Sequence, residues 1–113
     1  MNNNIQAMKL LNRMGITPNM FGYLYILEGI EIVKEHIESY ETFRAMKLYE
    51  EIAALHDVTP KSVERAIRLA KEKAWYDKNG KAKVMFPEIT ECPTNTAFIS
   101  LLAEHFIIQG GRK

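Results

Sequence analysis

The stretch LYEEIAALHDVTPKSVERAIRLAKEKAW, Leu48 to Trp75, decides the fold that the sequence predicts. It contains two amphipathic helical patterns, and only a short turn over residues 56–58 (HDV) separates them. Two helices joined in this way are typical of a helix-turn-helix, in which the second helix reads base edges in a DNA groove. We therefore expect an all-α fold with a central helix-turn-helix over about residues 43–76.

The start of the second helix is marked by Thr59 and Pro60. The threonine hydroxyl can accept an otherwise unpaired N–H of the first turn, and proline has no N–H to leave unpaired there. From this start the sequence predicts a helix over residues 60–76 with one apolar and one charged side. The apolar side consists of Val63, Ala66, Ile67, Ala70 and Ala74, and the charged side of Lys61, Glu64, Arg65, Arg68 and Glu72.

The turn holds Asp57 where helix-turn-helix turns often hold a glycine. Aspartate tolerates the left-handed backbone better than most residues with a side chain, so the turn is compatible with this sequence. The preceding helix is predicted over roughly residues 42–55, with an apolar stripe of Phe43, Met46, Tyr49, Ile52 and Ala53. Helical hairpins that do not bind DNA bury similar residues, so the pattern alone leaves a purely structural hairpin open.

The charge distribution favours DNA over that alternative. Residues 61–83 contain eight basic and three acidic residues, a net charge of +5, whereas residues 28–57 contain three basic and eight acidic residues, a net charge of −5. The whole chain carries only +1. A locally basic helix can hold phosphates while an acidic region faces away from them. A solvated charged face is the commoner meaning of such a run, but the capped second helix favours nucleic acid.

The rest of the chain predicts further helices. They span residues 4–14, with an apolar face of Ile5, Met8, Leu11 and Met14, then residues 18 or 22 to 40, and a last segment from Thr94 or Asn95 to Gly110. Residues 81–93 form either one short helix or a small β-wing, and Pro87 argues against a second strand. The sequence thus predicts a compact bundle of five to six helices in a single domain over residues 1–113, with no receiver domain in this chain.

No pattern in the chain indicates an enzyme. The three histidines, His36, His56 and His105, lie far apart and outside any metal-ligand spacing, and Cys92 is the single cysteine. We expect no catalytic site, no metal and no cofactor. The sequence has no secretory signal and no run of about 18 apolar residues, so we expect no membrane partner.

Three segments give the chain a resemblance to a known family. They are GYLYILEGI (Gly22 to Ile30), VERAIRLAKEKAW (Val63 to Trp75) and PTNTAFI (Pro93 to Ile99). In order and approximate spacing they resemble the C-terminal DNA-binding domain of the master sporulation response regulator of endospore-forming bacteria. The resemblance extends from about Ile5 to Phe106. It implies a six-helix bundle that binds a short promoter box, often as a tandem dimer, in the cytoplasm of a bacterium and associated with the nucleoid.

The resemblance and the charge pattern together predict a set of DNA-contacting residues. Arg65 would read guanine, and Glu64 would accept from cytosine or orient Arg65. Ser62 stands where the family has an arginine and Leu69 where it has a histidine, so we expect a different target sequence. The predicted base-reading residues are Lys61, Ser62, Glu64, Arg65 and Arg68, and the predicted phosphate contacts are Thr59, Lys71, Lys73, Lys78, Lys81 and Lys83.

The expected partners are double-stranded promoter DNA, a second copy of the chain on tandem sites, and RNA polymerase. Full-length members of the family carry an N-terminal phosphoacceptor domain, so this chain is either an excised domain or a stand-alone relative. An alternative function is a protein-interaction module that has kept the fold, no longer binds DNA, and forms mixed dimers with a full-length regulator.

Overall fold

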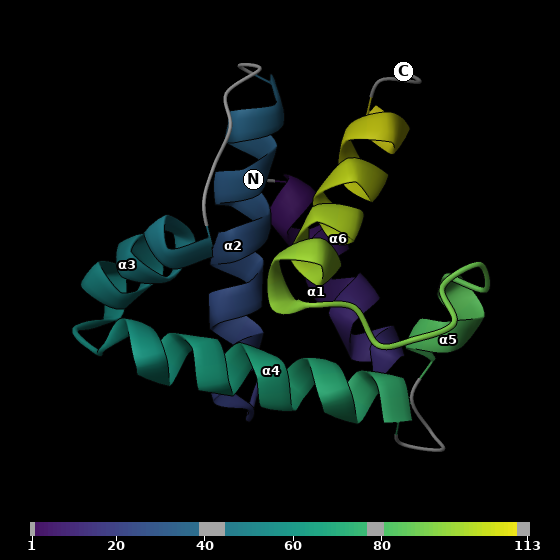
Figure 1. The fold of residues 1–113 in the computed structure, drawn as a ribbon. Helices are drawn as coiled ribbons and strands as arrows, with labels where there is room; N and C mark the ends of the chain where they lie inside the picture. The colour runs from purple at the N-terminus through teal and green to yellow at the C-terminus, as the bar shows by residue number, and fades with distance from the viewer. Residues whose placement is uncertain (1, 39–44, 77–80, 111–113) are drawn as a thin grey trace.

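The computed structural model describes residues 2–38, 45–76 and 81–110, and these residues form six α-helices and no strand (Figure 1). The all-α prediction is therefore confirmed, with the helix count at the upper end of the expected range. The helices are α1 (Asn2–Met14), α2 (Phe21–Glu38), α3 (Ala45–His56), α4 (Pro60–Tyr76), α5 (Ala82–Met85) and α6 (Asn95–Gly110).

Helix α2 is the centre of the bundle. It packs most extensively against α4 and α6, and it also contacts α1 and α3. Figure 1 shows α4 lying crosswise at one end of α2, while α6 lies beside α2. Because α2 has neighbours on several sides, its apolar residues extend around much of its circumference, and those buried are Tyr23, Tyr25, Ile26, Leu27, Ile30 and Val33. None of the described helices is long and apolar enough to cross a membrane.

Two glycines of α2 mark its closest helix contacts. A Cβ atom on Gly22 would clash with the carbonyl oxygen of Ala66 and would lie 2.9 Å from the Cβ of Ala70, and both of these residues are in α4. A Cβ atom on Gly29 would come within 3.0 Å of the Cδ1 methyl of Ile99 in α6. The crossing of α2 and α4 is therefore a contact of backbone with backbone, which a side chain at residue 22 would prevent.

Local hydrogen bonds close the C-terminus of α1 and the N-terminus of α6. Gly15 follows α1 with a φ of 93°, and the N–H of Ile16 donates to the carbonyl of Leu11 at 2.9 Å. This is a Schellman ending, and Ile16 and Leu11 are both fully buried, as its apolar contact requires. At the start of α6 the N–H of Ala97 donates to the hydroxyl of Thr94 at 3.2 Å. Thr94 thus caps a helix that begins at Asn95, in agreement with the prediction.

Two predicted core residues are exposed. Ile5 is 52% exposed, because α1 instead buries the stripe of Ala7, Leu10, Leu11 and Met14. Met46 is 58% exposed, because α3 buries Leu48, Tyr49, Ile52 and Ala53. In each helix two overlapping apolar stripes were available, and the position of the neighbouring helix decides which one is covered. Residues 42–44, where we expected α3 to begin, lie outside the described residues.

The ambiguous region after α4 contains a short helix, and residues 81–93 have no strand. In α5 the N–H of Phe86 donates to the carbonyl of Ala82 at 3.1 Å. Ala82 is fully buried, which anchors this single turn to the bundle. Pro87 follows directly and cannot donate a further backbone hydrogen bond. The β-wing alternative is therefore wrong for this region, and its proposed turn at Asn79-Gly80 lies outside the described residues.

Substitution of Gly22 tests the α2–α4 crossing. We expect Gly22→Ala to lower the free energy of unfolding by about 1–3 kcal/mol, because the new methyl group meets an immovable carbonyl. Gly29→Ala is the matched control, since its methyl meets only side-chain atoms of Ile99 and Ile52 and alanine gains about 1 kcal/mol in helix propensity. Urea unfolding followed by Trp75 fluorescence measures both. Equal stability of the two variants would contradict the proposed role of Gly22.

Candidate nucleic-acid interface

The turn between α3 and α4 depends on Asp57. Its φ of 56° lies in the left-handed region, which aspartate tolerates better than most residues with a side chain. The N–H of Val58 donates to the carbonyl of Ala53 at 3.1 Å, which closes the last turn of α3. This local geometry ends α3 and lets the chain start a new helix after two residues, Val58 and Thr59.

The N-terminus of α4 is closed by Thr59. The N–H of Ser62 donates to the Thr59 hydroxyl at 3.1 Å, and the N–H of Val63 donates to the Thr59 carbonyl at 3.1 Å. The hydroxyls of Thr59 and Ser62 lie 2.9 Å apart and share a hydrogen bond. The predicted cap is confirmed, and α4 begins at Pro60. Both hydroxyls are exposed, so the start of α4 presents polar groups and the positive end of its dipole to solvent.

Helix α4 is held on its inner side by a buried stripe and by a polar contact. The buried residues include Val63, Ile67, Ala70, Ala74 and Trp75. At the start of α6, Asn95 is 6% exposed, and its Nδ2 donates to the carbonyl of Glu64 at 3.0 Å. This bond joins the Asn95 side chain to the backbone of α4, on the inner side of that helix.

Tyr49 connects α3 to the same point. Burial raises the pKa of Tyr49, a hydrogen bond with the Asn95 side chain acts in the opposite direction, and the negative charge of Glu64 raises it further. The phenol, the amide and the start of α4 are therefore neighbours. The site is built where α3, α4 and α6 meet, and its orientation depends on all three helices.

A second polar contact fixes α3 on α2. The Nε2 atom of His56, the last residue of α3, lies 2.6 Å from Oε1 of Glu28 in α2. The His56 ring also packs edge-on against Tyr25, with ring centroids 5.1 Å apart. Because His56 directly precedes the turn, these contacts position the whole helix-turn-helix on the central helix.

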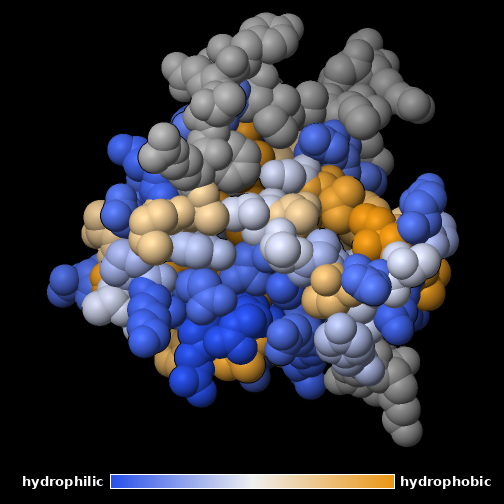
Figure 2. Space-filling model, in the orientation of Figure 1, coloured by the Kyte–Doolittle hydropathy of each residue, from blue (hydrophilic) through white to orange (hydrophobic). Residues whose placement is uncertain are grey.

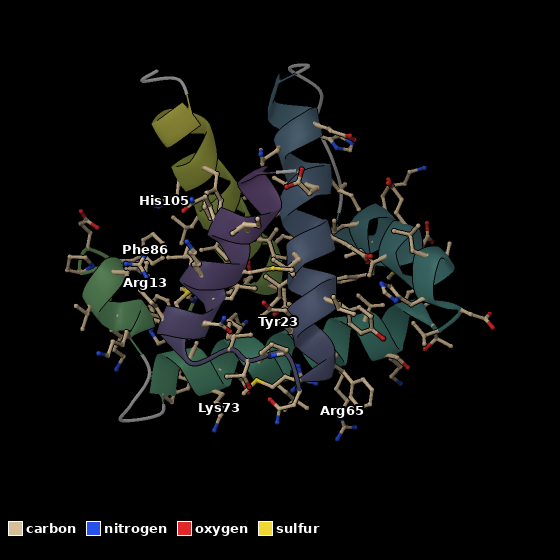
Figure 3. The ribbon with its side chains drawn as sticks, turned by 180° about the vertical axis from the view of Figure 1, so that it is seen from behind. Arg13, Tyr23, Arg65, Lys73, Phe86 and His105 are labelled. Atoms are coloured by element: carbon tan, nitrogen blue, oxygen red, sulfur yellow. The ribbon has the colours of Figure 1, made fainter. Side chains whose placement is uncertain are left out.

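The outer face of α4 carries the predicted reading residues. Lys61, Ser62, Arg65, Leu69 and Lys73 are exposed, and their spacing of three to four residues places them on one side of the helix. In Figure 3, Arg65 and Lys73 point away from the bundle, whereas Tyr23 lies inside it. Figure 2 shows hydrophilic residues gathered over the lower part of the molecule, where α4 lies.

Glu64 and Arg68 form an ion pair at the edge of this face. The Nε atom of Arg68 donates to Oε2 of Glu64 at 3.1 Å, and the two side chains are 43% and 35% exposed. The sequence left open that Glu64 orients Arg65, whereas in the structure Glu64 pairs with Arg68. At the spacing i, i+4 the two charges hold each other in place along the helix.

The predicted phosphate contacts are only partly brought together. Lys73, Lys81 and Lys83 are exposed, and the Nζ atom of Lys83 lies 5.8 Å from the ring centroid of Tyr76, at the C-terminal end of α4. Lys71 is 6% exposed. Burial raises the pKa of Cys92, and the positive charge of Lys71 offsets part of that rise. Lys71 therefore faces the segment around Cys92, and we remove it from the predicted phosphate contacts. Lys78 lies outside the described residues.

The family model of the sporulation initiation factor Spo0A C terminal matches residues 7–106. The chain belongs to this family. The Spo0A C-terminal family is the DNA-binding effector domain of a sporulation response regulator, and it is not a class of enzymes. The matched residues include all of α2 to α5 and most of α6, so the face described above lies within the family domain. Among the described residues, no three His, Cys, Asp or Glu side chains are placed to hold a metal ion.

Sequence reasoning missed the residues that position α4 from other helices. Asn95 lies 31 residues along the chain from its partner Glu64, and His56 lies 28 residues from its partner Glu28. Spacing on a single helix contains no signal for such contacts. Leu69 and Phe21 were likewise not expected to be neighbours, although both border one groove beside α4.

Removal of the Thr59 cap tests how the interface is positioned. We expect Thr59→Ala to lower the free energy of unfolding by about 1 kcal/mol and to speed amide exchange in the first turn of α4. Thr59→Ser keeps the hydroxyl and should retain most of the stability. If Thr59→Ala matched the wild type in both measurements, the hydroxyl would not be what closes the helix.

Proposed function

We propose that this chain is a sequence-specific DNA-binding transcription regulator that reads promoter DNA with α4 in the major groove. One observation carries the proposal. The exposed face of α4 presents cations on a capped helix whose opposite side is packed against α2, α3 and α6. A reading helix must be held rigidly, because base contacts discriminate only when donors meet fixed acceptors. Membership of the Spo0A C-terminal family supports DNA as the partner.

Arg65 is the principal base-reading residue in this proposal. It lies near the middle of the exposed face, five residues after the first residue of the helix. With α4 entering the groove N-terminus first, its guanidinium donates a bidentate pair to O6 and N7 of guanine. Lys61 and Ser62 lie in the first turn and reach the adjacent bases.

Glu64 and Arg68 read DNA as a pair in this proposal. Their ion pair preorganises both side chains before DNA arrives. Glu64 then accepts from N4 of cytosine, while Arg68 divides its donors between the carboxylate and a base or phosphate. Arg68 is the more exposed of the two, as this division requires.

A hydroxyl at the start of α4 and cations toward its end contact phosphates. Thr59 lies at the start of the helix, and Lys73, Lys81 and Lys83 lie toward its end. From Ser62 to Tyr76 the helix extends about 21 Å, enough to reach from the groove to the flanking backbone. These contacts position the domain and make binding depend on salt, but they carry no sequence information.

The target sequence differs from the one that the family commonly reads. Ser62 is shorter than the arginine of the family and shares its hydroxyl with Thr59. Leu69 is 50% exposed on the reading face and has no hydrogen-bonding group, so it can only touch a thymine methyl. We also propose that the chain binds tandem sites as a homodimer and contacts RNA polymerase. Both would take place in the bacterial cytoplasm, on the nucleoid.

Two substitutions separate base reading from phosphate binding. Arg65→Ala should weaken binding to the preferred site by about 1–3 kcal/mol and relax specificity at one base pair. Lys81→Ala should weaken binding to all duplexes alike and reduce the dependence of affinity on salt. Selection from random duplexes gives the site, and gel shifts at two salt concentrations give the affinities.

The same gel shifts distinguish the alternative function. Uniform binding of every duplex by both the wild type and Arg65→Ala would contradict specific reading. If the wild type bound no duplex at low salt but associated with a full-length regulator, the chain would be an interaction module. Ser62 and Leu69 are the observations that favour this second function, because each replaces a group that could contact DNA.

A further inference from the structure

An apolar groove lies beside the proposed reading face. It has a cavity volume of about 550 Å³ and runs between the N-terminal end of α2 and the outer side of α4. Phe21, Tyr25, Val58 and Leu69 line it, together with the small residues Gly22, Ala66 and Ala70. The groove exists because Gly22 brings the two helices together while no large side chain fills the space beside their crossing.

The groove is open to solvent in the chain by itself. Phe21 is 84% exposed and Leu69 is 50% exposed, and both border the cavity. Phe21 and Leu69 therefore place exposed apolar surface on the border of one hollow. Both residues lose exposed area when an apolar body enters the groove, and burial of that area favours binding.

The rim of the groove is cationic. Arg65 and Lys73 lie on α4, two turns apart on the same side (Figure 3). Both line the cavity. The Ser62 hydroxyl adds a polar group, and no carboxylate is among the lining residues that the structure describes. An occupant with a negative charge at the rim and an apolar body within the hollow matches this arrangement.

We propose that the groove binds a small amphipathic organic anion, with an aromatic or short acyl body between Phe21 and Leu69 and a carboxylate at Arg65 and Lys73. The volume falls within the range of about 300–1,000 Å³ of small-molecule sites. A duplex offers phosphates to the two cations, but its polar backbone does not fill an apolar hollow.

Occupancy of the groove opposes DNA binding. The anion uses Arg65, the residue proposed to read guanine, and covers Leu69 on the same face. One face cannot hold the anion and the major groove at once, so the two ligands compete. This consequence rests on the proposed function, whereas binding of the anion itself does not.

Binding is tested without DNA, with 2-naphthoate as the probe and neutral 2-naphthamide as its control. Titration followed by NMR should shift the resonances of Phe21, Val58 and Leu69 in a saturable manner, and naphthoate should bind more tightly than naphthamide. Shifts confined to other surfaces, or no saturable shift with either compound, would overturn the proposal. Concentration-dependent shifts at Leu69 with no probe present would assign the groove to a second copy of the chain instead.

Two variant pairs locate the site. Leu69→Gln should weaken both compounds, while Leu55→Gln, which alters a residue 65% exposed and outside the groove, should not. Arg65→Gln should weaken naphthoate about three- to tenfold and leave naphthamide unchanged. Lys61→Gln alters an exposed cation of α4 outside the groove and should change neither. Equal losses from Arg65→Gln and Lys61→Gln would mean that general charge attracts the probe.

The link to DNA is measured by competition. With naphthoate at ten times its own dissociation constant, the apparent dissociation constant for the selected duplex should rise about elevenfold, because only one chain in eleven is unoccupied. Naphthamide at a concentration that gives the same occupancy of the groove tests whether covering Leu69 alone weakens DNA binding. Sodium chloride at the concentration of the naphthoate is the salt control. Simultaneous binding would overturn the competition. A wild type that binds naphthoate but no duplex would refute the proposed function and leave the groove standing.

Discussion

The close crossing of α2 and α4 at Gly22 is the contact on which the rest of the structure depends. The backbone of α4 approaches α2 until only a hydrogen atom fits at residue 22. This approach seals the inner stripe of α4 against the central helix and turns its charged side outward. The same approach opens the groove between Phe21 and Leu69, because two tightly crossed helices diverge on either side of their contact. The outward charged face of α4 and the groove both result from the close approach at this one glycine.

Short polar contacts then set the direction of α4. The left-handed Asp57, the Thr59 cap and the Asn95 bond to the Glu64 carbonyl act within the turn, at the helix start and from α6. None is individually large, since net hydrogen bonds contribute about 0.5–1.5 kcal/mol each. Their effect is geometric, because together they leave α4 little freedom to rotate about its axis. In the proposed function α4 presents Arg65 to a base edge, and such rotation would then be the main loss of specificity.

Local signals predicted the helix-turn-helix well because the forces that make it are local. The start of α4 at Pro60 follows from a hydroxyl three residues before an N–H, and the turn follows from one residue that tolerates a positive φ. Burial was predicted less well. Most of the predicted stripes of α1 and α3 are buried, but Ile5 and Met46 are exposed because the neighbouring helices cover a side that is shifted around each helix. Lys71 was predicted to contact phosphate because of its charge, yet it lies on the buried side of α4 and is 6% exposed.

The sequence by itself determined the fold class, the limits of α4 and the side of that helix that bears Lys61 and Arg65. Each depends on interactions within a few residues, or on periodicity that a single helix must obey. Only the tertiary structure decided that Glu64 pairs with Arg68 within an interface supported by Asn95, that Lys71 is buried, and that Phe21 and Leu69 share a groove. The pairing depends on side-chain conformation, and the others depend on contacts between segments far apart in the sequence, whose relative placement comes from packing and close approach rather than from local preference.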